Sequence, residues 1–249
     1  MVNYVVDQRI EKLAKICVNY SAEVKPKEKV LITGTYLAFP LIHELYKECL
    51  LSDAYPQILI KPDVEYTFYK YAKEHQLKSI SPIDKFAMEN MDVRIYIKGD
   101  ANPKHLTNIN PEKIRSHSAA KGELYEILNK RTAEGALRWT LVAYPLNSLA
   151  QEASMSISEY EDFIYKSCFI DKKNPIAEWQ KLQKQQEKIC QFLNQKNKIH
   201  MLGEDTDLTF SVKGRKWINS SGKVNMPDGE VFTGPVENSV NGKIRSTYR

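Results

Sequence analysis

The first part of the chain repeats a short, continuous apolar run followed by a longer segment of mixed polarity. Continuous apolar runs of this length are typical of strands that are buried on both faces of a sheet. They occur at residues 29–34, 57–61, 93–97 and 137–143. Strands that alternate with helices pair in parallel through right-handed crossovers, so the pattern predicts a parallel sheet in an α/β layered fold.

The segments around these runs have apolar residues three or four positions apart, which places them on one side of a helix. The first such segment includes Val5, Val6, Ile10 and Leu13. The same spacing, with Pro and Gly as boundaries, predicts helices over residues 5–20, 38–52, 65–76, 84–90, a stretch from residue 111 to about residue 131, and 175–197.

The pattern of apolar and polar residues changes at residue 199. Short β-like segments at residues 199–202, 208–212 and 230–233 are separated by glycines. We therefore expect a layered parallel-sheet N-terminal domain over residues 1–197, ending in the long helix. The start of a second, mixed α+β domain is expected over residues 198–249.

Charge and composition narrow the function classes. The net charge of +5 comes from 36 Lys and Arg against 31 Asp and Glu, without a concentrated basic block. The densest basic segment, residues 181–198, has no ladder of aromatic residues, which argues against a nucleic acid partner. No apolar run approaches the roughly 20 residues of a membrane span. We expect a cytoplasmic protein with no membrane partner, and four reduced core cysteines, because none forms a Cys-x-x-Cys pair.

Several common catalytic and nucleotide motifs are missing from the sequence. Gly34 follows the first strand, but the further glycines of a dinucleotide-binding turn do not follow it. The histidines lie singly and form no His-Glu-x-x-His pair. No serine lies in a Gly-x-Ser-x-Gly elbow. The common motifs for nucleotide binding, zinc binding and serine hydrolysis therefore give no indication of the function.

Several other features occur together in the order and spacing of one known family. They are Trp139 to Pro145 followed by Ala150 and Met155, Thr-Asp-Leu-Thr-Phe at residues 206–210, Gly-Arg-Lys-Trp at 214–217, and Asn-Met-Pro-Asp-Gly-Glu-Val-Phe-Thr at 225–233. With them the chain resembles the metallo-aminopeptidase family typified by aminopeptidases T and S, over essentially its whole length. The resemblance implies an enzyme that removes N-terminal residues from peptide substrates. It also implies two divalent ions, zinc or cobalt, and a homodimer.

The resemblance also implies a role for one carboxylate. The family's first metal-binding Glu lies in its Gly-Glu-Val-Phe-Thr motif, which corresponds to Glu230. Two bound ions lower the pKa of a shared water and stabilise the oxyanion that follows its attack. Asp228 and Glu237 are nearby but do not match that position. The alternative is that Glu230 is an ordinary exposed residue at a strand edge.

The chain departs from the family after this motif. The family's other ligands, a Glu, two His, a Tyr and an Asp, and its catalytic base come from positions downstream that have no counterpart before Arg249. One carboxylate cannot hold two ions that each need about four ligands. We therefore expect no catalytic residue in this chain, an incomplete metal site and very low activity of the chain alone. The main alternative is a non-catalytic binding or interaction protein derived from the N-terminal domain; a nucleotide-binding protein rests on fold analogy alone.

Overall fold

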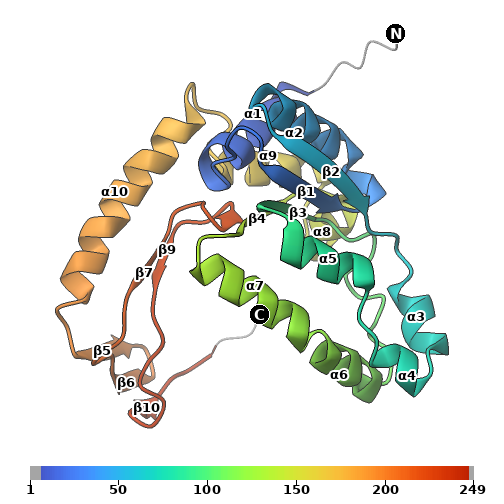
Figure 1. Ribbon diagram of the computed structural model, residues 1–249. Coiled ribbons are helices and arrows are strands. Elements are labelled where there is room, and N and C mark those ends of the chain that lie inside the picture. The colour runs from blue at the N-terminus through green and yellow to red at the C-terminus, as the bar shows by residue number, and fades with distance from the viewer. Residues whose placement is uncertain (1–6, 247–249) are drawn as a thin grey trace. The chain divides into compact units, whose positions relative to one another are not determined.

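A computed structural model describes residues 7–246 (Figure 1). The chain divides into two compact units. The first comprises Met1–Ile176 and Lys223–Pro227, and the second comprises Ala177–Gly222 and Asp228–Arg249. This division differs from the expected domains over residues 1–197 and 198–249, which stay a prediction. The difference has two causes: most of the long helix groups with the second unit, and a short later segment pairs with the sheet of the first.

The first unit is built on a parallel five-stranded sheet with the order β2-β1-β3-β4-β8. The strands are β1 (Lys29–Gly34), β2 (Tyr55–Ile60), β3 (Val93–Lys98), β4 (Arg138–Ala143) and β8 (Asn225–Met226). Ile32 of β1 lies opposite Ile95 of β3, and both are fully buried. The predicted parallel α/β layers are therefore confirmed.

Helices cover both faces of this sheet. In Figure 1, α1 (Gln8–Ile16) and α2 (Phe39–Leu51) lie on one face, and α5 (Pro82–Asn90) and α7 (Gly122–Ala133) lie on the other. The remaining helices of this unit are α3 (Glu65–Tyr71), α4 (Glu74–Leu77), α6 (Pro111–Ala120), α8 (Asn147–Glu152) and α9 (Ile157–Ser167). Helices on both faces bury every residue of β1 after Lys29, which fits its continuous apolar run. The edge strand β2 is mostly exposed, and in β3 buried residues alternate with more exposed ones.

Three predicted helices differ from those observed. The stretch expected from residue 111 to about residue 131 is divided into α6 and α7, with Lys121 between them. The helix expected over residues 5–20 ends as an α-helix at Ile16 and continues as the π-helical turn η1 (Cys17–Ser21); Val5 and Val6 lie outside the described residues. The helix expected over residues 65–76 is divided into α3 and α4. Ala72 is extended, with ψ 135°, and the backbone N–H of Lys73 donates to the Gln76 side chain at 2.8 Å. This new cap starts α4, and the continuous periodicity does not reveal it.

The second unit is mixed α+β, as expected for its fold class. It contains α10 (Pro175–Leu193) from Ala177 onward, and a three-stranded antiparallel sheet of β10 (Asn241–Lys243), β6 (Thr206–Ser211) and β5 (Lys198–Gly203). A separate antiparallel pair is formed by β7 (Ile218–Ser220) and β9 (Glu230–Phe232). The Asn219 side chain of β7 donates to the Gln183 carbonyl of α10 at 2.9 Å. This bond ties the β7–β9 pair to α10.

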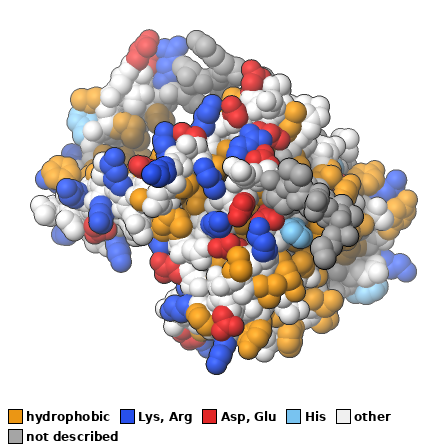
Figure 2. Space-filling model, turned by 90° about the horizontal axis from the view of Figure 1, so that it is seen from above, with side chains coloured by type: hydrophobic (Ala, Val, Ile, Leu, Met, Phe, Trp, Pro, Cys, Tyr) orange, Lys and Arg blue, Asp and Glu red, His pale blue; other side chains and the backbone are white. Residues whose placement is uncertain are grey.

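The surface charges, the helices and the cysteines can be compared with the expectations from the composition. On the face shown in Figure 2, Lys and Arg side chains are interspersed with Asp and Glu side chains. None of the helices within residues 7–246 combines the length and the apolar character that a membrane crossing requires. The cysteines Cys17, Cys49, Cys168 and Cys190 are buried thiols outside any disulfide, as predicted. Burial raises the pKa of the Cys49 thiol to about 12, so this thiol stays protonated at neutral pH.

Candidate functional site

The segment that contains Glu230 is divided between the two units. Its first residues form β8, in which Asn225 pairs with Leu141 and Met226 with Val142 in the first unit's sheet. Met226 is buried at 1% exposure, which anchors this end of the segment. From Asp228 onward the chain belongs to the second unit, and Glu230 is the first residue of β9.

A tight turn places Glu230 at the start of its strand. Gly229 has φ +127°, a backbone conformation that side chains disfavour. The Asp228 carboxylate accepts hydrogen bonds from the backbone N–H groups of Gly229 at 3.0 Å and Gly222 at 3.4 Å. The Gly229 N–H also donates to the Ser220 carbonyl at 3.1 Å, next to the paired position of Ser220 and Glu230. Asp228 therefore shapes the turn.

The three carboxylates of this region have different environments. Glu237 forms an ion pair with Arg215 at 2.6 Å, and a hydrogen bond to its own backbone together with this pair lowers the pKa of its carboxyl. Asp228 is engaged by the turn. Glu230 is exposed, and its carboxylate has neither a hydrogen bond nor an ion pair with any residue in the described range 7–246. Among these three, Glu230 is thus the one available to an external partner.

The described residues do not form a metal site by themselves. Between residues 7 and 246, no group of three or more His, Cys, Asp or Glu side chains converges in a way that could hold a metal ion. His200, the histidine of the second unit, is hydrogen-bonded to Asp207 at 2.9 Å. A divalent ion needs several protein ligands, so the residues described here do not fit a complete centre. The role of Glu230 as a metal ligand stays a prediction.

A second candidate site lies in the first unit, and the sequence analysis did not predict it. A pocket of about 320 Å³ opens where β1, β2 and β3 end, and Thr35, Lys61 and Asp100 are among its lining residues. Ligands of open α/β sheets commonly bind outside the carboxyl ends of the strands. The predicted strand ends were therefore a usable signal, but the lining side chains form no recognisable motif.

Comparisons with known proteins agree with one another. The family described as thermophilic metalloprotease (M29) matches residues 6–249. Aminopeptidase PepS of Streptococcus thermophilus is 24% identical over 264 residues, covering 96% of this chain and 64% of the relative. Aminopeptidase 2 of Geobacillus stearothermophilus is 25% identical over 265 residues, covering 97% of this chain and 64% of the relative. This chain therefore spans less than two thirds of the length of these relatives.

The fold is also shared with a solved structure. Wild-type AmpT from Thermus thermophilus superposes with a TM-score of 0.80 at 22% identity, covering 97% of this chain and 65% of that chain. At this level of identity the superposition establishes a common fold. The family match extends through both compact units, from residue 6 to residue 249. The chain belongs to the thermophilic metalloprotease (M29) family.

Proposed function

We propose that this protein is a metal-dependent aminopeptidase that releases N-terminal residues from peptides. The observation that carries the proposal is the family match over residues 6–249, together with relatives that are named aminopeptidases. The match favours the catalytic interpretation over the non-catalytic binding protein, because it includes the second unit as well as the sheet domain.

Within this function, Glu230 is proposed as one metal-binding carboxylate. Its exposure, its lack of a partner in the described part of the chain and its place in the Gly-Glu-Val-Phe-Thr motif support this role. Zinc or cobalt, two ions per complete site, are the proposed metals, and such ions supply an activated water for hydrolysis. Because the described residues form no complete centre, no catalytic step is assigned to them. The resemblance to the family also supports a cytoplasmic homodimer.

Removal of divalent metal is expected to abolish peptide cleavage. The assay uses the native gene product, in the full length that its source cells make, and follows release of the first residue from leucyl peptides. A chelator should stop the release, and added zinc or cobalt should restore it, because the ions activate the attacking water. Cleavage at the full rate by the metal-free protein would contradict the proposal. A folded protein that binds no metal and cleaves no peptide would favour the non-catalytic alternative.

A Glu230→Gln substitution is expected to lower kcat/KM for leucyl peptides by roughly tenfold to 100-fold, because a neutral amide is a poorer ligand for a divalent ion than a carboxylate. Metal content, measured by elemental analysis, should fall in the same variant. Glu237→Gln is the matched control, since Glu237 already pairs with Arg215 in the same unit. If the two variants retain equal activity and metal content, Glu230 is not a ligand, whatever the outcome of the chelation experiment.

A further inference from the structure

The pocket of about 320 Å³ in the first unit lies at the topological switch point of the parallel sheet. From β1 the chain passes to β2 on one side, and then crosses to β3 on the other side of β1. The loops that follow β1 and β3 therefore leave in opposite directions and open a crevice, where open α/β sheets commonly bind ligands. We call this cavity the switch-point pocket; its lining includes Thr35, Tyr36, Asp63, Tyr96, Asp100 and Lys121.

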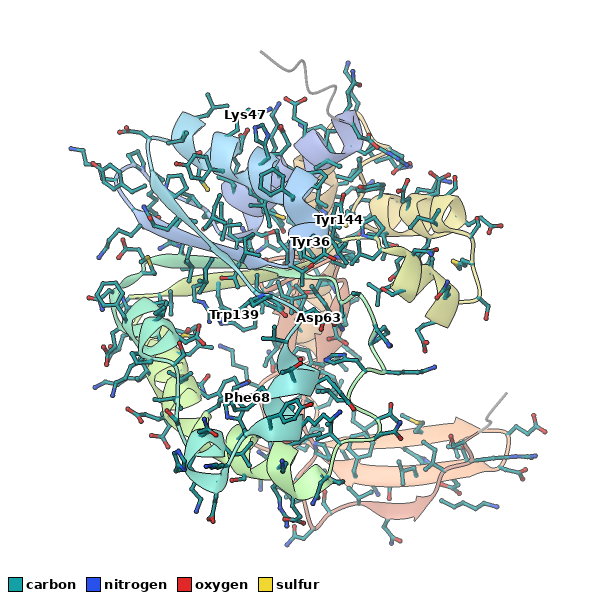
Figure 3. All side chains as sticks on the ribbon, turned by 90° about the vertical axis from the view of Figure 1, so that its right-hand side faces the viewer. Tyr36, Lys47, Asp63, Phe68, Trp139 and Tyr144 are labelled. Atoms are coloured by element: carbon teal, nitrogen blue, oxygen red, sulfur yellow. The ribbon has the colours of Figure 1, made fainter. Side chains whose placement is uncertain are left out.

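A second pocket adjoins the switch-point pocket and forms an extension of it. A neighbouring pocket of about 560 Å³ shares Lys61, Val64, Glu65 and Lys121 with it, and its other lining residues include Phe68. The Phe68 ring lies 4.8 Å from the His117 ring, and both line this extension. In Figure 3 the labelled residues Tyr36, Asp63 and Phe68 follow one another down this side of the unit. The extension therefore adds the rings of Phe68 and Tyr69 to the wall of the cavity, beside polar side chains such as Asp84 and His117.

Some of the charges in the pocket are already neutralised within the protein. Lys61 forms an ion pair with Asp84 at 2.7 Å, and the His105 imidazole lies 3.3 Å from the Glu65 carboxylate. Burial opposes protonation of His105, but hydrogen bonds to the Asn102 carbonyl and to Glu65 outweigh it and raise the pKa of the imidazole. These groups shape the wall of the pocket and leave little charge for a ligand.

The remaining charges are different. Asp63, Asp100 and Lys121 line the switch-point pocket, and none of their charged groups has a hydrogen bond or an ion pair in the part of the chain that the structure describes. Asp63 is exposed, and its negative charge also helps to raise the pKa of the His105 imidazole. Asp100 and Lys121 are half-buried. Charges of both signs thus face one cavity without pairing with each other. A ligand that has both an ammonium and a carboxylate group would neutralise them together.

We propose that the switch-point pocket binds a free α-amino acid with an apolar side chain. Asp63 and Asp100 receive the ammonium group, Lys121 receives the carboxylate, and the side chain extends toward Phe68. The pocket volume of about 320 Å³ is at the small end of the range of ligand sites, which suits such a compact molecule. The inference rests on unit-one residues alone and does not depend on the proposed peptidase activity or on Glu230.

Titration calorimetry of the chain with L-leucine tests the proposal. We expect saturable binding of one leucine per chain. Two leucine analogues separate the charges: 3-methylbutan-1-amine lacks the carboxylate, and 4-methylpentanoic acid lacks the ammonium group. Each should bind at least about tenfold more weakly, because one charged hydrogen-bonding partner in the pocket is left unpaired. Absence of saturable binding by leucine would overturn the proposal. Equal binding of the amine would reduce the site to one for organic cations and would also overturn it.

Variants locate the binding. Asp100→Asn and Lys121→Gln should each weaken leucine binding at least about tenfold, since each removes one charge of the pair. Glu126→Gln and Lys130→Gln are matched controls on α7, outside the lining of the pocket, and should bind as the unaltered chain does. Circular dichroism confirms that all four variants are folded. Leucine binding that is unchanged in both pocket variants, or tighter binding of dileucine than of leucine, would contradict the assignment.

Discussion

Replacing Ile95 with Ala is expected to lower the free energy of unfolding of the first unit by about 2–5 kcal/mol. Ile95 lies in β3, between Ile32 of β1 and Thr140 of β4, and is fully buried. Truncation removes buried methyl groups and leaves a cavity that helices on both faces prevent from collapsing completely. Urea denaturation followed by circular dichroism measures the loss.

The control for this prediction is Ile83→Ala in α5. The Ile83 side chain is 63% exposed, so its removal costs little transfer free energy. Alanine is also the better helix former, and we expect a change within about 0.5 kcal/mol. Equal destabilisation by the two substitutions would show that the β3 position is not the centre of this core. Tyr96 of β3 lines the switch-point pocket, but Ile95 does not. Leucine binding by Ile95→Ala should therefore stay unchanged under conditions in which the first unit is folded.

Replacing Gly242 with Ala is expected to release β10 from the three-stranded sheet of the second unit. Gly242 has φ +121°, and an added Cβ would overlap the carbonyl oxygen of Asp207. That oxygen cannot move away easily, because Asp207 in β6 is also paired with Leu202 in β5. Strain of this kind costs on the order of 1–3 kcal/mol, which is large for a strand with three paired positions.

Hydrogen exchange read by mass spectrometry tests the release of β10. Amides of residues 241–243 should exchange faster in Gly242→Ala, while those of β1 and β3 in the first unit stay protected. Gly122→Ala is the control: a Cβ there meets no atom within 4 Å, and the backbone φ is not positive. Unchanged protection of β10 in Gly242→Ala would mean that the Gly242 backbone does not approach Asp207 in solution.

The strands of the first unit were predictable because their local pattern reflects their environment. β1 was predicted with its observed bounds, since every residue after Lys29 in it is buried and apolar residues dominate the run. The division between α3 and α4 was not predictable from periodicity. Apolar residues continue at helical spacing through that region, and the break depends on the extended backbone at Ala72.

The two candidate sites also differ in how far the sequence alone could predict them. Glu230 could be singled out from the sequence because it lies within a continuous motif, although its role as a ligand stays a prediction. Asp63, Asp100 and Lys121 could not be singled out. They follow different strands and helices, and each by itself resembles an ordinary surface charge. The parallel arrangement of β1, β2 and β3 brings the loops of Asp63 and Asp100 to one pocket, and the junction of α6 and α7 adds Lys121.

The sequence by itself determined the α/β character of the first unit, because short apolar runs alternate with segments of helical spacing along the chain, and in β1 burial on both faces leaves a continuous apolar run. The tertiary structure alone decided where residues 225–227 belong. β8 has two residues, too few for any periodicity, and it pairs with Leu141 and Val142 of β4 from far along the chain. An unpaired edge of β4 offers backbone donors and acceptors that must find partners. Pairing with β4 places Asn225–Met226 in the first unit, while Glu230 belongs to the second. The hydrophobic pattern of the sequence does not reveal this pairing.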